Sequence, residues 1–356
     1  MEITIIGVDP HKRSHTAVVL DDEERIAAEL RVEAGPKQLD RLLGWAPAGP
    51  RVWAVENANG LRRLLSRQLV GHGEQVVDVP ASLAARARRL SGHSGRKTDA
   101  FDARSVVIAA HHHGGLRQVT VDDDAELVGL LLARRDRLVE ARTRTVNQLH
   151  ALLSEIHAGG AKRDLTPVAV SRLLARHRPA TAVEETRKQL ARELITEWRR
   201  IDRQVQKATT DLDDAVTATG TTLTGIPGIA TIGAARILAI VGDIDRFPTP
   251  GHFASFTGTA PLEASSGDVT RHRLSRRGNR QLNTVLHIAA RTQTRNQGPG
   301  RPYFDRKIAE GKSDREALRC LKRQLSNVVY RRLHADRQAR AAAARGGHHG
   351  TNPKAA

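Results

Sequence analysis

The chain has 356 residues, enough for two or three domains, and 39% of them are hydrophobic, which allows buried cores. A formal net charge of +18 and a pI of about 11.1 favour a polyanion as partner rather than a basic macromolecule. A single cysteine, Cys320, excludes a disulfide framework and a cysteine-based zinc site, and no apolar run approaches the ~18 residues of a membrane span.

The start of the chain, "MEITIIGVD", lacks the basic region and cleavage site of a signal peptide. We therefore expect a cytoplasmic protein without membrane contact. If its polyanionic partner is DNA, the protein should associate with the nucleoid.

Residues 1–115 predict an α/β domain. Three apolar runs with short polar connections, "ITIIGVD", "HTAVVLD" and "RIAAELRVEAG", predict three strands joined as hairpins. Helical and strand patterns then alternate as far as residue 112. Three strands followed by alternating helix and strand is the order of a ribonuclease-H-like, or RuvC-like, domain.

Four carboxylates of this domain are candidate metal ligands. Asp9 follows the first apolar run, Glu56 ends the strand "RVWAVE", and Asp99 and Asp102 lie three residues apart in "RKTDAFDAR". Residues at i and i+3 share a helix face, so the two aspartates repel each other unless a cation lies between them. Four carboxylates could hold one or two Mg²⁺ ions, which prefer oxygen ligands. The alternative is a solvated helix start capped by Thr98.

Residues 116–220 predict a helical connector. Long helices are expected at 124–156 and 183–217, with apolar residues near heptad spacing. Those residues are Leu127, Leu131, Leu138, Leu149 and Leu153 in the first helix and Leu190, Leu194, Trp198, Ile201, Val205 and Leu212 in the second. The pair predicts a coiled coil, antiparallel or between chains; an ordinary helical spacer is the alternative.

Residues 221–340 predict a mostly helical C-terminal domain, followed by a disordered tail at 341–356. The segment "GIPGI", with Gly225 and Gly228, resembles the hairpin of a helix-hairpin-helix element. Backbone N–H groups at the start of the next helix could bind a phosphate without reading bases. The alternative is a turn whose glycines permit tight packing.

Basic residues concentrate towards the C-terminus. Between Asp268 and Arg340, 19 lysines and arginines face 6 acidic residues, a net charge of +13. We expect phosphate contacts from a basic loop and from a pair beside the aspartates, and a solvated basic face is the alternative. The candidates are Arg271, Arg273, Arg276, Arg277 and Arg280, with Arg96 and Lys97. Aromatic residues make up only 3%, so base stacking should contribute little.

Several motifs together resemble the DEDD transposases of the insertion-sequence one-ten family, relatives of the pilin-gene invertase. These are "GVDPHK", "VEN", "RKTDAFDAR", "GIPGI" and "SSG" followed by "SRRGNRQL", and the likeness covers about residues 3–335. The resemblance implies a RuvC-like domain, a coiled-coil connector and a C-terminal transposase domain. It maps the DEDD acids, as Mg²⁺ ligands and catalytic groups, onto Asp9, Glu56, Asp99 and Asp102.

The resemblance also implies a serine nucleophile, and it assigns Ser266 rather than Ser265. Such a serine attacks double-stranded DNA at the element ends and target and forms a covalent phosphoserine link. The resemblance further implies a structured guide, or bridge, RNA and assembly as a homo-oligomer, a dimer to tetramer.

Two other interpretations remain open. The first is a RuvC-like nuclease of the junction-resolvase kind that uses water as nucleophile. The second is a non-enzymatic nucleic-acid-binding protein whose acids only cap helices.

Overall fold

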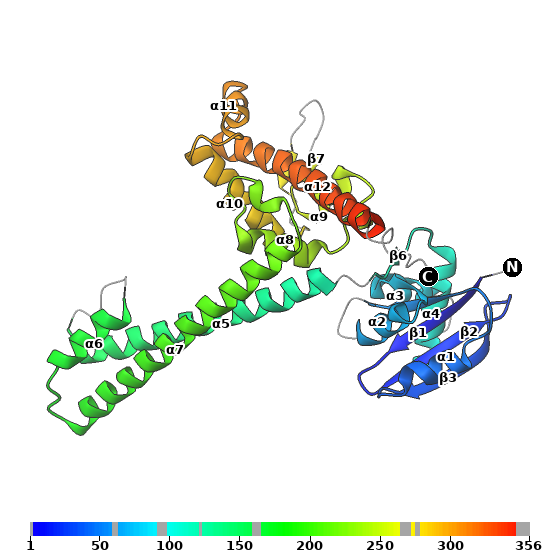
Figure 1. The fold of residues 1–356 in the computed structure, drawn as a ribbon, viewed down its shortest axis with the longest axis horizontal. Coiled ribbons are helices and arrows are strands. Elements are labelled where there is room, and N and C mark those ends of the chain that lie inside the picture. Colours follow the sequence, from blue (N-terminus) through cyan, green and yellow to red (C-terminus); the bar gives the residue numbers. More distant parts are fainter. Residues whose placement is uncertain are drawn as a thin grey trace, which may run out of the picture. The chain divides into compact units, whose positions relative to one another are not determined.

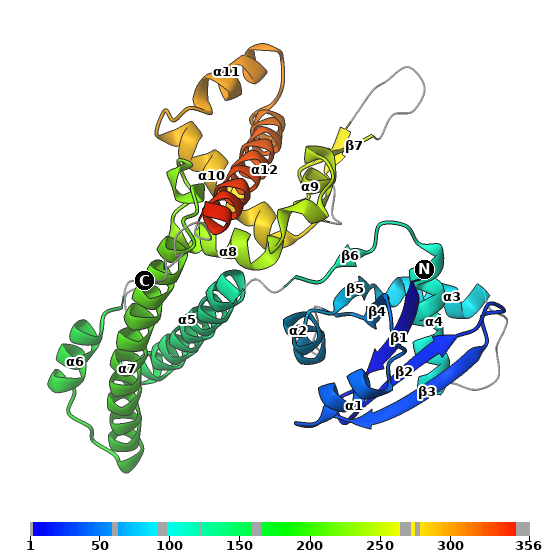
Figure 2. The ribbon, with the colours of Figure 1, turned by 45° about the vertical axis from the view of Figure 1, so that its right-hand side comes forward.

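The computed structural model describes residues 3–58, 63–90, 98–120, 123–158, 165–263, 272–274 and 278–346. The chain divides into two compact units (Figures 1 and 2). Met1–Val121 contains a β-sheet flanked by helices and is called the α/β unit below. Asp122–Ala356 is mostly helical and is called the helical unit.

The α/β unit contains a six-stranded sheet in the order β3-β2-β1-β4-β5-β6. Strand β1 is antiparallel to β2 and parallel to β4, and β5 is parallel to β4. The elements, in chain order, are β1 (Thr4–Pro10), β2 (Ser14–Leu20), β3 (Ile26–Glu33), α1 (Gln38–Trp45), β4 (Arg51–Glu56), α2 (Arg63–Gly71), β5 (Gln75–Val79), α3 (Ala81–Leu90), α4 (Asp99–His112) and β6 (Arg117–Gln118). The predicted order of three strands followed by alternating helix and strand is confirmed, and β6 adds a short edge strand.

The central strand β1 separates two cores because successive side chains point to opposite faces of a sheet. Ile6 and Val8 are fully buried in a core that also contains Leu42 of α1 and Leu69 of α2. The opposite face, which carries Gly7, is covered by α4. Residues at odd positions near the end of β1 therefore face α4.

The helical unit begins with two long helices that pack side by side over much of their length, as both views show (Figures 1 and 2). They are α5 (Asp123–Ile156) and α7 (Ala182–Ala218), and the short α6 (Pro167–Arg176) packs against α7. Thr166 and Thr181 cap α6 and α7 through side-chain oxygens that accept backbone N–H bonds. The two long predicted helices are confirmed; their supercoiling as a coiled coil stays a prediction.

Two leucines of the predicted apolar stripes are not buried. Leu127 of α5 is 50% exposed and Leu190 of α7 is 44% exposed, so both lie outside the seam that these two helices bury between them. Leu138, Ile201 and Val205, which belong to the same predicted stripes, are buried in that seam as expected. Heptad spacing identifies a helix face, but the neighbouring helix decides which part of that face is covered.

The remainder of the helical unit packs around one apolar core, to which α8, α10 and α12 contribute. Its elements are two 3₁₀ turns, η1 (Leu223–Gly225) and η2 (Ile244–Arg246), α8 (Thr231–Val241), α9 (Pro250–Phe256), the antiparallel pair β7 (Pro261–Glu263) and β8 (His272–Leu274), α10 (Arg280–Arg295), α11 (Arg301–Ala309) and α12 (Asp314–Gly346). The mixed α/β and mostly helical composition agrees with the predicted fold class. The finer division into connector, transposase domain and tail stays a prediction, as does the helix-hairpin-helix element. Among the helices described, none is long and apolar enough to cross a membrane.

Candidate active site

Asp9 and Glu56 come together at the same edge of the sheet. The parallel register of β1 and β4 pairs Val8 with Val55, and each acid is the next residue along its strand. Asp9 lies on the α4 face with Gly7, and Glu56 lies on that face with Ala54, since residues two apart on a strand point the same way. Asp9 is 2% exposed and Glu56 is half-buried.

Helix α4 reaches this edge because β1 carries a glycine where the helix crosses it. A Cβ atom at Gly7 would lie 2.4 Å from both the carbonyl oxygen of Ala103 and Cγ2 of Val107. Any larger residue would therefore push α4 away from the sheet. The first turn of α4, with Asp99 and Asp102, is thereby held beside the strand ends.

Asp9, His11 and Asp99 form a close polar cluster at this edge. Nε2 of His11 lies 3.0 Å from the Asp9 carboxylate and 3.4 Å from that of Asp99. One ligand atom from each residue lies within 4.8 Å of the other two, a group that could hold a metal ion. Arg31 of β3 adds a guanidinium group 3.3 Å from Asp99.

His11 was missed by the sequence analysis, although its position was visible there. It follows Asp9 by two residues, so alternation along the strand and into the turn places both on one face. A bond from its backbone N–H to the carbonyl of Ser14, at 2.8 Å, closes the β1–β2 turn that holds it.

Asp102 lies one turn further along α4 and forms a separate contact. It is 8% exposed, and its carboxylate lies 2.8 Å from the guanidinium of Arg88 on α3. Of the four predicted ligands, Asp9 and Asp99 belong to the close group of ligand atoms in the described chain, whereas Glu56 and Asp102 do not. Thr98 does cap α4, accepting a bond from the N–H of Phe101 at 3.4 Å, so the capping interpretation holds for that residue.

The charges at this edge explain how a nearly buried carboxylate is tolerated. Burying a carboxylate is costly unless a cation or hydrogen-bond donors accompany it. Asp9 has the imidazole of His11, Asp99 has Arg31, and Asp102 has Arg88, so each acid lies beside a group that can carry positive charge. The two carboxylates and one imidazole nitrogen of the close group fit a divalent cation in their donor chemistry.

Several predicted residues of the helical unit lie outside the described residues, namely Ser265, Ser266, Arg271, Arg276 and Arg277, as do Arg96 and Lys97 of the α/β unit. Arg273 belongs to β8, but its side chain is not described, and Arg280 is the exposed first residue of α10.

Close contacts hold the chain before and after residues 264–271, the segment that contains Ser265 and Ser266. Gly258 and Gly278 approach so closely that a Cβ on Gly278 would lie 2.2 Å from the Cα of Gly258. The side chain of Asn283 donates to the carbonyl of Gly258 at 2.9 Å and accepts from the buried ammonium of Lys322 at 2.6 Å. Asn279 then caps α10 by accepting from the N–H of Leu282 at 3.0 Å.

The "GIPGI" turn packs against α10. Gly228 has φ +89°, and a Cβ there would lie 2.7 Å from the Cα of Ala289. Gln293, which is 3% exposed, donates from Nε2 to the carbonyl of Pro227 at 2.9 Å. This agrees with the tight-packing interpretation for Gly228, whereas Gly225 is exposed and has open space around its Cα.

Comparison with known proteins places both units in one family. A family model for the DEDD domain of IS110-type elements, described as a transposase, matches residues 6–158. A second, described as the transposase IS116/IS110/IS902 family, matches residues 220–305.

Three relatives illustrate the similarity. An uncharacterized 44.8 kDa protein of insertion element IS116 from Streptomyces clavuligerus is 29% identical over 93% of this chain and 95% of its own length. An uncharacterized 43.6 kDa protein of IS110 from Streptomyces coelicolor is 28% identical over 88% and 95%. A transposase of element IS1111A from Coxiella burnetii is 31% identical over 62% and 61%. With both family domains and full-length relatives, this chain belongs to the IS110 family of insertion-sequence transposases, the enzymes of DNA transposition.

Proposed function

We propose that this transposase cuts and rejoins DNA through a covalent phosphoserine at Ser266, with Mg²⁺ bound by the DEDD acids Asp9, Glu56, Asp99 and Asp102. The observation that carries the proposal is the closeness of Asp9 and Asp99, brought together from a strand and a helix that are distant in sequence. Acids that only capped helices would not need to meet at a strand end.

The metal part of the proposal rests on the donor set. Asp9 and Asp99 supply oxygens within 4.8 Å of one another. Glu56 lies on the neighbouring strand β4, and Asp102 lies one turn further along α4. When bound, a divalent cation would act as a Lewis acid on phosphate oxygens. His11 lies close enough either to ligate that cation or to orient the two carboxylates.

The serine step is an exchange of phosphoesters. The Oγ–H bond of Ser266 and the bond from phosphorus to a leaving deoxyribose oxygen break, an Oγ–P bond forms, and the proton ends on the leaving oxygen. Attack by the hydroxyl of another strand reverses the exchange. Because the phosphodiester bond energy is kept in the protein–DNA link, rejoining needs no nucleotide cofactor.

Support for Ser266 comes from the anchored chain around it. Gly258 and Gly278 are in close backbone contact, and Asn283 and Lys322 hold that contact from α10 and α12. Such a backbone contact would help to hold the serine hydroxyl in a defined position. Arg273 and Arg280, next to it in sequence, would hold flanking phosphates together with Arg271, Arg276 and Arg277.

A structured guide RNA and a homo-oligomer complete the proposal, as the family resemblance implies. The net charge of +18 suits a second nucleic acid beside the DNA. Leu127, Leu130 and Leu190 leave apolar surface exposed on α5 and α7, which supports contact with another copy through a coiled coil. Backbone groups near Gly225 would add a phosphate contact of the helix-hairpin-helix kind.

The test is capture of a covalent protein–DNA adduct. End-labelled duplexes carrying an element end, incubated with the full chain, Mg²⁺ and RNA transcribed from the element, should yield an adduct that survives denaturing electrophoresis. Ser266→Ala should abolish it, with a fall in strand exchange of at least ~10³-fold. Ser265→Ala is the matched control and should retain the adduct.

Two results would overturn this proposal. Cleavage by Ser266→Ala at the normal rate would assign the reaction to a nuclease that uses water. An adduct retained in Ser266→Ala and lost in Ser265→Ala would move the nucleophile by one residue.

A further inference from the structure

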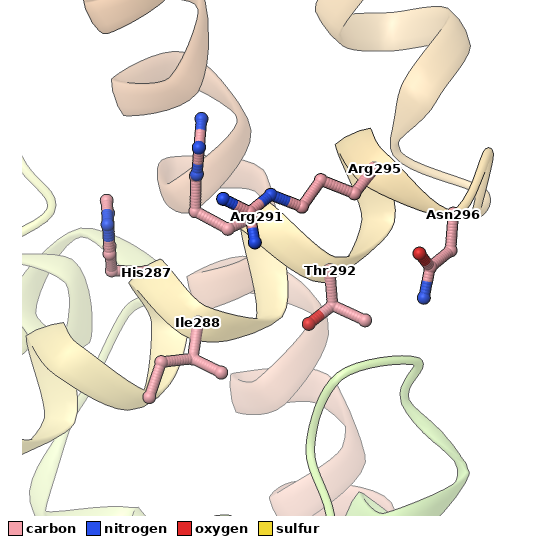
Figure 3. A pocket seen from close by; sticks show the side chains of 6 residues that line it. All are labelled: His287, Ile288, Arg291, Thr292, Arg295 and Asn296. Atoms are coloured by element: carbon pink, nitrogen blue, oxygen red, sulfur yellow. The ribbon is translucent and has the colours of Figure 1, made fainter. Parts of the chain in front are cut away.

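The exposed side of α10 carries a groove. The groove has a volume of about 440 Å³ and is lined by His287, Ile288, Arg291, Thr292, Arg295 and Asn296. His287, Arg291 and Arg295 are spaced by four residues, so they share one helix face. Figure 3 shows Arg295 extending back along α10 towards Arg291, with the side chains of Thr292 and Asn296 below them in this view.

Among the described residues, the two arginines of this groove have no acidic partner. Within the described chain, neither Arg291 nor Arg295 forms an ion pair with a carboxylate, and both are exposed. Other arginines of the unit do pair, as Arg236 with Asp136 at 2.7 Å and Arg301 with Asp305 at 2.8 Å. The groove therefore keeps two guanidinium groups available for an anion from outside.

The neighbouring groups make the local potential more positive. Partial burial, and then the charges of Lys322 and Arg291, hold the pKa of His287 below its ordinary value. Burial and the nearby Arg319 likewise lower the pKa of Lys322. The positive charges of Lys322, Arg291 and Arg319 that contribute to these shifts make a region where an anion is favoured.

The floor of the groove is rigid. Gly228 of the "GIPGI" turn lies against Ala289, and a Cβ on it would also approach Cβ of Thr292 to 3.0 Å. The bond from Gln293 to the carbonyl of Pro227 holds the same turn. The groove side chains therefore rise from a helix that cannot shift easily, which lowers the cost of ordering on binding.

We propose that this α10 groove binds the phosphodiester backbone of a nucleic acid. Planar guanidinium groups make paired hydrogen bonds to phosphate oxygens, and hydroxyl and amide groups such as those of Thr292 and Asn296 are common phosphate donors. Ile288, 54% exposed, gives an apolar surface for the sugar edge. The contact reads no bases, so it positions the strand and leaves sequence choice to other parts of the complex.

The test compares matched double variants of the full chain. Arg291→Ala/Arg295→Ala removes two charges four residues apart on α10, and Arg199→Ala/Arg203→Ala removes two charges with the same spacing on the exposed side of α7. Fluorescence anisotropy would measure binding to an arbitrary 30-base-pair DNA and to a structured RNA at several salt concentrations. The α10 variant should lose about tenfold or more in affinity, and its slope of log affinity against log salt on duplex DNA should shrink by about 1.8.

The nucleic acid used in each arm identifies the source of the phosphate. A loss confined to DNA assigns the groove to the element or target, and one confined to RNA assigns it to the guide. Equal losses in both double variants, or none in the α10 variant, would overturn the proposal.

A second measurement uses the wild-type chain and so does not depend on whether the double variant folds. Hydrogen exchange of the wild-type chain should slow in residues 287–296 when DNA or RNA is added, and unchanged exchange there would also overturn the proposal. Binding is measured without strand cleavage, so failure of the Ser266 mechanism would leave this result unaffected.

Discussion

The acidic edge of the α/β unit and the basic groove of the helical unit differ in whether their charged side chains lie beside groups of opposite charge. At the acidic edge, Asp9, Asp99 and Asp102 each lie beside a cationic or protonatable side chain of the same unit. In the groove, Arg291 and Arg295 have no carboxylate partner among the described residues.

The difference follows from burial. A carboxylate that is 2% exposed, like Asp9, needs a compensating charge in the folded protein whether or not a metal is bound, because its desolvation is costly. Exposed guanidinium groups are solvated by water and need none. Exposed arginines such as Arg291 and Arg295 can therefore stay without a carboxylate partner in the described chain, whereas Asp9, Asp99 and Asp102 lie beside His11, Arg31 and Arg88.

Loss of a buried acid should have the largest effect and would test the acidic side of this comparison. Asp9→Asn removes an oxygen ligand and its charge, so Mn²⁺ binding, followed by electron paramagnetic resonance, should weaken by more than the ~10–100-fold typical of an outer-shell partner. Strand exchange should fall to background. Asp40→Asn, an exposed acid of α1, is the control and should change neither measurement. Wild-type Mn²⁺ affinity in Asp9→Asn would refute the metal site.

The second-largest effect should come from a substitution at the close approach of α4 to β1. Gly7→Ala places a methyl group 2.4 Å from Ala103 and Val107, so the unfolding free energy of the α/β unit should fall by about 3 kcal/mol. Denaturant titration of the full chain measures this. Gly44→Ala, in α1 with open space around it, should instead gain about 0.5–1 kcal/mol. A neutral Gly7→Ala would mean that α4 has room to move.

A substitution at the corresponding contact in the helical unit should cause a smaller but still measurable loss of stability. Gly228→Ala brings Cβ to 2.7 Å from the Ala289 backbone at φ +89°, and we expect a loss of about 2 kcal/mol. Gly225→Ala meets no atom within 4 Å and should change stability by less than about 0.5 kcal/mol. Stability equal in the two variants would argue against tight packing as the role of Gly228.

The smallest effect concerns pH. Because burial lowers the pKa of Lys322 below 10.5, the unfolded chain holds this proton more tightly than the folded one. Wild-type stability should therefore rise relative to Lys322→Met as pH increases from neutral towards 10.5. Unfolding curves at several pH values, with the exposed Lys312→Met as control, measure the difference. Parallel pH profiles for wild type and Lys322→Met would contradict the prediction.

Sequence patterns were sufficient for the elements and for part of the site. Alternating apolar residues predicted β1 to β5, and the spacing of Asp99 and Asp102 predicted a shared helix face; both depend on local backbone geometry alone. The convergence of Asp9 with Asp99, 90 positions apart, could be proposed from the ribonuclease-H-like order of strands and helices and from the family resemblance, but not from local spacing. His11 could have been identified from its spacing to Asp9 on the strand.

Other features needed the packed structure. Leu127 and Leu190 fit the heptad pattern yet are exposed, because the seam between α5 and α7 is set by how the two helices meet. The "GIPGI" turn matched a phosphate-binding hairpin as well as a packing turn, and only the contact of Gly228 with Ala289 separates these roles at that glycine.

The sequence by itself determined the family, the order of strands and helices and the excess of positive charge, since these depend on residue types and their spacing along the chain. The tertiary structure alone decided which cationic or protonatable groups lie beside Asp9, Asp99 and Asp102, and which arginines of the described chain have no acidic partner. That assignment depends on distances of a few ångströms between residues far apart in the chain, and those distances are set by close contacts such as that of Gly7 with α4.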